Sequence, residues 1–375
     1  MRIIFATNNY TPYSGGVVSS IQAMVDGLHH KKHEVIVVSL DFLGISHNDP
    51  HYVRRVKSPI RFFYKQNYMA IPWRPTQYMK QLVKSYRPDI MHVHHPFLLG
   101  ISGLHAARSI DIPCVFTYHT LYEQYAHYLP VPQPISQQLI KYTVHNFCTS
   151  VNSIIVPSNA IKNHLHSQKI LSPIEVIPSP LRTPFLSDFL NIISKDTQPF
   201  FELLTVSRFV PEKNIPFIFE IFKLLPTSIR LTLVGYGADY ENIQRLAFDI
   251  IKLPRNRIRF IHKPEQNDLL SLYRSSHLFL FSSKTDTQGL VMVEAMSQGL
   301  PVIAIDGPGQ RDIIQNGMNG FIIDTAHQAA TLIVNIMNNS PLYNHLSTGA
   351  YATSQKYHPH HITTQLINFY HTTIN

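Results

Sequence analysis

Two carboxylates in the last third of the chain, Asp286 and Glu294, are spaced so that both could contact one ligand. Between them, at Gly289, a polar loop gives way to a helical pattern that begins at Leu290. The start of a helix offers free N–H groups to an anion, and Glu294 would lie about one turn further along. These residues predict a bound phosphate with Glu294 beside it and Asp286 toward the far end of the same ligand. A phosphate flanked by two carboxylates that bind hydroxyl groups describes a nucleotide sugar.

Two cations, Arg208 and Lys213, follow an apolar run at Leu203–Val206 that predicts a buried strand. Doubly wound sheets bind ligands at the carboxyl ends of their strands. Arginine suits bidentate contact with phosphate oxygens and lysine supplies a point charge, so the pair could clamp a diphosphate from two directions. The alternative is an ordinary surface turn between a strand and a helix. Gly235 and Gly237 lack the third glycine of a dinucleotide fingerprint, so a NAD site is not predicted.

The first half of the chain offers two further candidates, Gly16 and His119. Gly16 lies in the loop after the first expected strand and would let the backbone approach a phosphate or a sugar, although a bare tight turn explains it equally well. His119 ends another strand and could face a cleft, whereas a lone histidine is more often structural. Four ring side chains follow just beyond it: Tyr122, Tyr125, His127 and Tyr128.

Alternating strands and helices predict two parallel, doubly wound sheets. The expected strands are Arg2–Ala6, Glu34–Ser39, Asp89–Val93, Val115–Tyr118, Ser153–Val156, Leu203–Val206, Arg230–Val234, Arg259–Ile261, Leu278–Phe281 and Val302–Ile305, with helices at Val17–Leu28 and Gln137–Thr149. Prolines 178, 180 and 184, followed by a polar stretch to Gln198, indicate an inter-domain connection. We therefore expect an N-terminal domain over residues 1–185, a C-terminal domain over 186–350 and a final helical segment over 351–375.

Composition narrows the class of protein. A length of 375 residues favours two domains. No apolar run is long enough for a transmembrane helix, and the first residues do not resemble a signal peptide. Cys114 and Cys148 lie in apolar surroundings and suggest no disulfide framework, so a cytoplasmic, reducing setting is the default.

The net charge of +9 comes almost entirely from the first half and concentrates in Tyr52–Arg87, a window without a single acid. Its cations are Arg54, Arg55, Lys57, Arg61, Lys65, Arg74, Lys80, Lys84 and Arg87, and its rings include Phe62, Phe63, Tyr64, Tyr68, Trp73 and Tyr78. Cations mixed with rings suit an anionic membrane surface. Single-stranded nucleic acid and a plain solvated face are the alternatives.

The many histidines raise the question of metal binding. His92, His94 and His95 lie on and just after one strand, and His358, His360 and His361 lie near the C-terminus. Neither group has zinc-finger spacing, and the chain has no Asp-x-Asp pair to hold a metal on a diphosphate. We expect no metal and no cofactor, because Arg208 and Lys213 can supply the positive charge instead.

The segment Ser283–Ile305 resembles the donor-site signature of retaining family-4 glycosyltransferases of GT-B fold, in which an acidic residue is followed after seven residues by Glu. Here Asp286 stands where Glu is usual, and Gln288 precedes Gly289 where Phe is common. The sequence T-D-T-Q-G at residues 285–289 is similar to the corresponding motif of the subgroup that contains diacylglycerol glucosyltransferases. The resemblance covers nearly the whole chain and implies two Rossmann-like domains, with the last helix crossing back onto the first domain.

The resemblance also assigns roles. It implies that Asp286 contacts the sugar hydroxyls and Glu294 the ribose, while Arg208 and Lys213 neutralise the departing diphosphate together with the helix start at Gly289, Leu290 and Val291. It places Gly16 against the diphosphate and His119 near the reacting centre, and it implies transfer with retention of configuration. With His119 so placed, the ring side chains just beyond it are expected to line the acceptor side: Tyr122, Tyr125, His127 and Tyr128.

The expected function is therefore transfer of a hexose, favouring UDP-glucose as donor, to a lipid such as diacylglycerol, by a protein peripheral to the inner face of the cell membrane. Alternatives are a soluble sugar, a polysaccharide or a cell-surface glycan precursor as acceptor, and GDP-mannose as donor. A non-catalytic binder of nucleotide sugars or of nucleic acid is the alternative from another class, although a nucleic-acid partner leaves the donor-site pattern unexplained.

Overall fold

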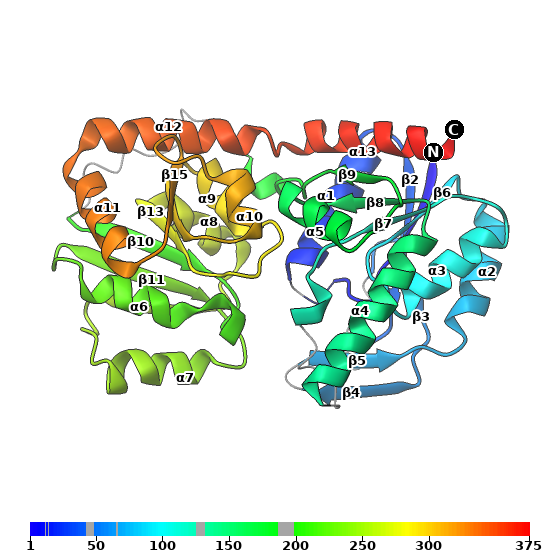
Figure 1. The fold of residues 1–375 in the computed structure, drawn as a ribbon, viewed down its shortest axis with the longest axis horizontal. Helices are drawn as coiled ribbons and strands as arrows, with labels where there is room; N and C mark the ends of the chain where they lie inside the picture. The colour runs from blue at the N-terminus through cyan, green and yellow to red at the C-terminus, as the bar shows by residue number, and fades with distance from the viewer. Residues whose placement is uncertain (12, 14, 43–48, 65–66, 125–131, 187–198) are drawn as a thin grey trace. The chain divides into compact units, whose positions relative to one another are not determined.

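The computed structural model describes residues 1–11, 13, 15–42, 49–64, 67–124, 132–186 and 199–375. The chain divides into two compact units. Unit 1 consists of Met1–Pro180 together with Pro359–Asn375, and unit 2 consists of Leu181–His358 (Figure 1). Each unit is a parallel sheet with helices on both faces, which is the α/β architecture that the alternating pattern predicts.

Unit 1 is built on a seven-stranded sheet in the order β3-β2-β1-β6-β7-β8-β9, in which every described pair is parallel. Its strands are β1 (Arg2–Ala6), β2 (Glu34–Leu40), β3 (Val53–Val56), β6 (Ile90–Val93), β7 (Cys114–Thr117), β8 (Ser153–Val156) and β9 (Ile174–Val176). The central strands are buried on both faces, so they read as continuous apolar runs rather than as alternating ones.

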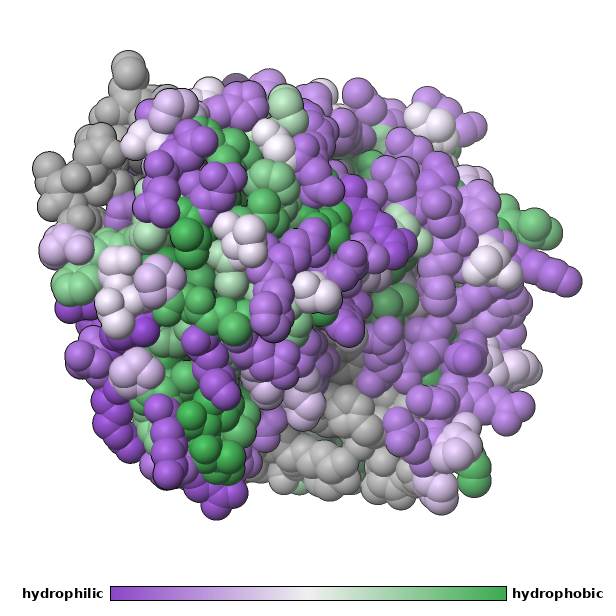
Figure 2. Space-filling view, turned by 60° about the vertical axis from the view of Figure 1, so that its left-hand side comes forward, coloured by the Kyte–Doolittle hydropathy of each residue, from purple (hydrophilic) through white to green (hydrophobic). Residues whose placement is uncertain are grey.

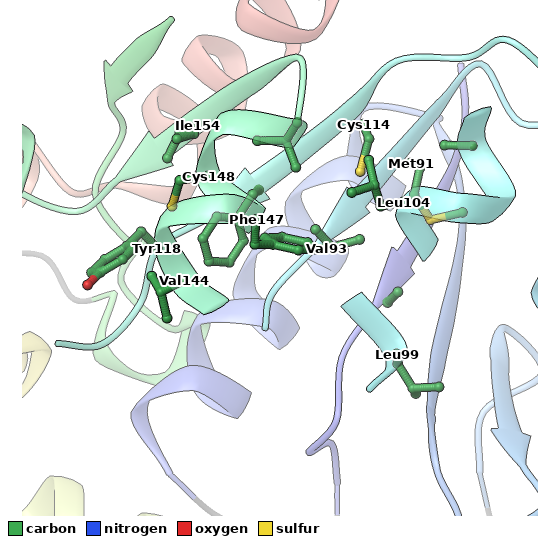
Figure 3. Packing of buried hydrophobic residues seen from close by; sticks show 14 of the residues in the cluster. Met91, Val93, Leu99, Leu104, Cys114, Tyr118, Val144, Phe147, Cys148 and Ile154 are labelled. Carbon is green, nitrogen blue, oxygen red and sulfur yellow. The ribbon is translucent and has the colours of Figure 1, made fainter. Parts of the chain in front are cut away.

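The helices of unit 1 form two separate cores. One face of the sheet is covered by α1 (Gly16–His30) and α13 (Pro359–Ile374). The core of the other face takes side chains from α2 (Pro75–Tyr86), α3 (Leu99–Arg108), α4 (Gln133–Ser150) and α5 (Asn159–Ser167). Figure 3 shows this second core, where Phe147 and Cys148 of α4 pack beside Val93 and Ile154 of the sheet.

The helix α13 returns the end of the chain to unit 1 and packs against α1. Gly27 allows this approach, because a Cβ at that position would collide with the Thr363 side chain. The expected helical segment 351–375 is divided between α12 (Ser340–Gln355) in unit 2 and α13 in unit 1. The units divide after Pro180, ahead of the expected boundary at residue 185. The expected polar stretch up to Gln198 falls mostly on 187–198, outside the described residues.

Unit 2 is built on a six-stranded parallel sheet in the order β12-β11-β10-β13-β14-β15. Its strands are β10 (Phe201–Val206), β11 (Ile229–Gly235), β12 (Ile258–His262), β13 (Leu278–Phe281), β14 (Val302–Ile305) and β15 (Gly320–Ile323). Its helices are α6 (Ile215–Lys223), α7 (Tyr240–Arg245), α8 (Gln266–Ser275), α9 (Leu290–Ser297), α10 (Pro308–Ile313), α11 (Ala326–Asn338) and α12. β1 is an inner strand of the sheet in unit 1, and β10 is an inner strand of the sheet in unit 2. The loops that follow these two strands lie at the carboxyl ends of the strands, where doubly wound sheets bind their ligands.

The basic window folds into three pieces: β3, a separate hairpin and α2. The hairpin pairs β4 (Ile60–Tyr64) with β5 (Asn67–Ile71) in antiparallel register and belongs to neither large sheet. Two of the window's cations are tied into the unit itself, since Arg55 forms a bidentate ion pair with Asp49 and Arg61 pairs with Asp41. These two arginines therefore hold the local fold as well as carrying charge.

The described part of the chain bears on two expectations drawn from composition. Cys114 and Cys148 are free and buried, and burial raises the pKa of each thiol to about 12. Neither is a thiolate at neutral pH. None of the described helices is both long enough and apolar enough to span a membrane.

Candidate active site

The helix α9 begins at a sharp left-handed turn. Gly289 has a φ of 76°, a value that side-chain-bearing residues rarely adopt, and a Cβ there would lie 2.5 Å from Cε of Met292. The turn carries the chain directly from the loop after β13 into the helix. The first-turn N–H groups of α9, at Leu290 and Val291, thus lie at the carboxyl edge of the sheet, where an anion can bind them.

Glu294 lies about one turn after the start of α9 and is 4% exposed. Its Oε1 accepts hydrogen bonds from Nε and Nη2 of Arg182, at 3.0 and 2.8 Å. Its Oε2 accepts a bond of 3.2 Å from the Tyr273 hydroxyl. A buried carboxylate is costly unless it is paired and hydrogen-bonded, and this one is both. The pairing fixes the orientation of the carboxylate.

The partners of Glu294 are themselves positioned. The Arg182 guanidinium stacks 4.9 Å above the ring of Phe185, and that ring meets the Tyr273 ring edge-on. Burial, together with the charge of Glu294, raises the pKa of Tyr273 well above its usual value. Tyr273 is therefore a protonated hydrogen-bond donor at neutral pH. The sequence reasoning missed both partners, because Arg182 and Tyr273 lie far from the α9 motif along the chain.

The other carboxylate, Asp286, is paired with Lys213. Nζ of Lys213 lies 2.7 and 2.8 Å from the two oxygens of Asp286. Lys213 ends a short helical turn, Pro211–Lys213, after β10. The loop that carries Asp286 is fastened to this turn by Ser282, whose hydroxyl donates to the Lys213 carbonyl at 2.6 Å. The structure thus brings together two residues that the sequence placed in separate motifs.

The loop carrying Asp286 is also held from its other side. Gly309, in α10, donates its N–H to the Asp286 carbonyl at 3.0 Å, and a Cβ on Gly309 would collide with the Gln288 backbone. Gln310 is fully buried and donates to the Ser283 carbonyl at 2.5 Å. The loop between β13 and α9 is therefore hydrogen-bonded on one side to the turn after β10 and on the other side to α10.

Arg208 lies on the same loop as Lys213 and forms an ion pair of 3.7 Å with Glu212. Its side chain is 33% exposed, more than those of Lys213 or Asp286. Gly235 lets this loop approach β11, since a Cβ there would collide with the Ser207 carbonyl. The glycine turn after β11 thus supports the Arg208 loop by close packing.

In unit 1, Gly16 is the first residue of α1. It is exposed, and no described heavy atom comes within 4 Å of the position its Cβ would occupy.

His119 follows β7 in unit 1, and its Nε2 lies 2.9 Å from Nδ1 of His94. Burial, with the neighbouring histidines adding to it, lowers the pKa of both imidazoles well below the usual value. Behind them, fully buried His92 bonds the Tyr370 hydroxyl at 2.5 Å and the Thr117 hydroxyl at 2.6 Å. His119 is thus the half-buried end of a buried row of imidazoles.

Tyr122, expected on the acceptor side, is 8% exposed and packs edge-on against the rings of Phe97 and Tyr118. Its ring belongs to the core of unit 1. The other three residues of that expectation, Tyr125, His127 and Tyr128, lie outside the described residues. Among the residues that the structure describes, no three or more His, Cys, Asp or Glu side chains gather in a way that could hold a metal ion.

Comparison with known proteins identifies the class. Residues 14–183 match the domain described as glycosyltransferase family 4, and residues 192–353 match glycosyl transferases group 1. This pair of domains, folded as two Rossmann-like sheets, defines a hexosyltransferase enzyme. The chain belongs to the family-4 glycosyltransferases of GT-B fold, as the resemblance predicted, and is similar to the diacylglycerol glucosyltransferases within it.

The relatives agree with this assignment. The chain is 26% identical to the alpha-monoglucosyldiacylglycerol synthase of Streptococcus pneumoniae, over 91% of this chain and 79% of the relative, and 27% identical to that of Acholeplasma laidlawii, over 95% and 93%. It is 26% identical to a GDP-mannose-dependent alpha-mannosyltransferase of Mycobacterium tuberculosis, over 86% and 84%. The crystal structure of Anabaena HepE in complex with UDP has the same fold, with a TM-score of 0.77 over 99% of this chain and 100% of that one, at 18% identity.

Proposed function

We propose that this enzyme transfers glucose from UDP-glucose, with retention of configuration, to a lipid acceptor such as diacylglycerol at the inner face of the cell membrane. The observation that carries the donor half is the pairing of Asp286 with Lys213 beside the N-terminus of α9. A cation, a hydroxyl-binding carboxylate and free N–H groups then converge where a sugar diphosphate must be held.

In this proposal each group in unit 2 has one task. Glu294, oriented by Arg182 and Tyr273, accepts hydrogen bonds from the ribose hydroxyls. Asp286 accepts hydrogen bonds from hydroxyls of the transferred sugar. Lys213, Arg208 and the N–H groups from Gly289 to Val291 stabilise the charge that develops on the diphosphate as it leaves. From unit 1, Gly16 is assigned to the diphosphate and His119 to the sugar near its reacting carbon.

The chemistry breaks the bond between the anomeric carbon and a diphosphate oxygen. A bond from the acceptor oxygen to that carbon forms on the same face, and the acceptor proton passes to a diphosphate oxygen. The products are the glycoside and the nucleoside diphosphate. No protein nucleophile is needed, and the protein contributes positioning and electrostatic stabilisation.

We further propose that the enzyme works without a metal. Two fixed cations and a helix N-terminus offer the positive charge that a divalent ion would otherwise supply to the diphosphate. The ion pair between Lys213 and Asp286 keeps the ammonium group at the site before the donor arrives, so that little reorganisation is needed when the diphosphate binds.

A lipid acceptor is supported by the two diacylglycerol-glucosylating relatives and by the basic window of unit 1. Six of its described cations are exposed, whereas Arg55 and Arg61 are tied into ion pairs; the six are Arg54, Lys57, Arg74, Lys80, Lys84 and Arg87. Exposed cations without neighbouring acids attract a membrane rich in anionic lipids. This feature favours an acceptor that resides in the membrane over a soluble sugar, a polysaccharide or a glycan precursor.

A second candidate is mannosyl transfer from GDP-mannose, because the mycobacterial mannosyltransferase matches nearly as much of the chain at similar identity. The experiment that separates these candidates offers UDP-glucose or GDP-mannose, each labelled in the sugar, with vesicles containing diacylglycerol or with soluble glycan acceptors. The proposal predicts label from UDP-glucose in the lipid fraction. Label from GDP-mannose alone, or label only in soluble products, would replace it with the corresponding alternative.

A further inference from the structure

The β4–β5 hairpin of unit 1 presents its apolar side chains outward. Cross-strand pairing places Ile60 opposite Ile71 and Phe62 opposite Met69. Because side chains alternate along a strand, these four residues share one face of the hairpin. They are 55%, 47%, 44% and 44% exposed, in that order.

The opposite face of the same hairpin points into the unit. Ala70 is 5% exposed and joins the core, and Arg61 pairs with Asp41. The pattern is the reverse of that of an ordinary surface hairpin, which buries its apolar face. Exposed apolar residues are normal on a protein surface when they stand alone. Figure 2, in which unit 2 comes forward, shows such hydrophobic side chains among hydrophilic ones. A paired ladder of them marks an interaction surface.

The helix α4 carries a second outward apolar row. Ile135, Leu139 and Tyr142 are 61%, 55% and 67% exposed, and their spacing of four and three residues places them on one helical face. The opposite face, including Val144 and Phe147, packs in the core shown in Figure 3. In the view of Figure 1, the hairpin and the first turns of α4 both reach the lower edge of unit 1.

The charge around these two rows identifies what covers them. Neither Tyr52–Arg87 nor α4 contains an acidic residue, and the exposed cations of the window lie beside the hairpin in sequence. Trp73, 60% exposed, lies two residues after the end of β5 and has the Arg74 guanidinium 5.4 Å from its ring. Tryptophan beside arginine suits the headgroup level of a bilayer, with apolar groups below and cations at the phosphates.

We propose that unit 1 docks on an anionic bilayer by inserting this wedge, which we define as the outward faces of β4–β5 and α4 together with Trp73. The inference deepens the proposed function, because a lipid acceptor requires such contact. It predicts a contribution to membrane binding that salt does not screen, in addition to the electrostatic attraction of the exposed cations.

Trp73 is the single tryptophan of the chain, so its fluorescence reports on the wedge alone. The experiment titrates the full chain with vesicles of phosphatidylglycerol and phosphatidylcholine, once at low salt and once at about 1 M salt. At about 1 M salt the Debye length falls to about 3 Å, so the attraction between exposed charges and the vesicle surface is largely screened. We expect a blue shift of Trp73 emission, quenching by lipids brominated near the headgroup, and binding that partly survives high salt. A double variant, Phe62→Asp with Ile71→Asp, and the single variant Leu139→Asp should each weaken the salt-resistant binding about tenfold or more.

The matched control is Leu171→Asp, which removes a 92% exposed apolar side chain of unit 1 outside the hairpin and α4. It should bind as the wild type does. An unshifted Trp73 emission, or an equal loss in Leu171→Asp, would overturn the proposal. So would a wild-type dimer in sedimentation velocity that Phe62→Asp dissociates, because a second copy would then cover the ladder. Vesicle binding without transfer to diacylglycerol would leave the wedge standing and refute the proposed acceptor instead.

Discussion

Nδ1 of His94 lies 2.9 Å from Nε2 of His119, and the other ring nitrogen of His94 is buried without a hydrogen-bond partner among the described residues. If His119 donated this bond, His94 would carry its proton on that partnerless nitrogen. An unpaired buried N–H is costly, so His94 is the donor and His119 accepts through Nε2. His119 then carries its own proton on Nδ1 and offers it as a hydrogen-bond donor.

We therefore predict the Nδ1–H tautomer for His119, which long-range ¹⁵N–¹H NMR reads directly. His94→Phe should return His119 to a mixture of tautomers and lower kcat more than it raises KM. His94→Asn, which restores a donor, should recover part of the activity. The Nε2–H tautomer in the wild type would contradict the hydrogen-bond assignment.

The same row of imidazoles predicts sensitivity to acid. Burial lowers the pKa of His92 to about 3 and that of His95 to about 4, whereas unfolded histidine titrates near 6.5. The unfolded state therefore binds protons first as the pH falls below about 6.5. The stability contributed by these neutral rings is complete above that pH and is lost progressively toward pH 4, at up to about 1.4 kcal/mol per group and pH unit.

Thermal unfolding between pH 8 and 4.5 measures this loss. We expect a nearly constant Tm above pH 7 and a steep fall below pH 6.5. Hydrogen exchange at pH 5 should show the loss first in β6 and β7, which carry or adjoin the four histidines. A Tm that stays level down to pH 4.5 would contradict burial of neutral imidazoles.

The pairing of Arg182 with Glu294 predicts a role for a residue that no donor-site motif contains. Glu294→Ala should raise the dissociation constant of UDP by about 10-fold to 100-fold, which corresponds to the free energy of one charge-assisted hydrogen bond. Arg182→Ala should weaken UDP binding as well, because it leaves a buried carboxylate without its cation. Calorimetric titration with UDP measures both, and Arg274→Ala, near Gln298 on the same unit, serves as a control. Wild-type affinity in Arg182→Ala would remove it from the site.

Loss of either cation that we assign to the diphosphate should affect catalysis. Lys213→Ala and Arg208→Ala should each lower kcat by about two decades. Asp286→Ala should chiefly lower turnover, because it breaks the ion pair with Lys213 and removes the proposed contact to the sugar. Addition of EDTA to the wild type should change little. Complete inhibition by EDTA that Mg²⁺ or Mn²⁺ reverses would overturn the metal-free mechanism.

The exposed cations give a separate prediction about the membrane. Replacing Arg54, Lys57, Lys80 and Lys84 by Glu should strongly weaken vesicle binding at low salt and leave only its salt-resistant part, since each cation contributes about 1 kcal/mol near an anionic surface. UDP affinity should not change, because the proposed nucleotide site belongs to unit 2. Arg55 and Arg61 are left in place, since their ion pairs support the fold. Unchanged vesicle sedimentation would reduce the patch to a solvated face.

The alternating pattern of the sequence predicted the parallel sheets well, because strands such as β8 and β13 are short apolar runs buried on both faces. It did not predict β4–β5, because the inward face of this hairpin carries Arg61 and Ala70 while its large apolar side chains lie on the exposed face, which reverses the usual signal. The motifs at Asp286 and Lys213 could be read separately, but their direct contact depends on two loops meeting at the sheet edge. The sequence could not predict the hydrogen-bond partners of Glu294 either, since Arg182 lies 112 residues away along the chain.

The central claim is tested most directly by the anomeric configuration of the product. UDP-glucose, in which glucose is α-linked, is incubated with the enzyme and vesicles of diacylglycerol and anionic phospholipid, and the glycolipid is isolated. We predict a glucosyl-diacylglycerol whose anomeric proton has the small coupling of an α-glucoside in ¹H NMR. A β-glucoside, or glucose released without any glycolipid, would contradict the account.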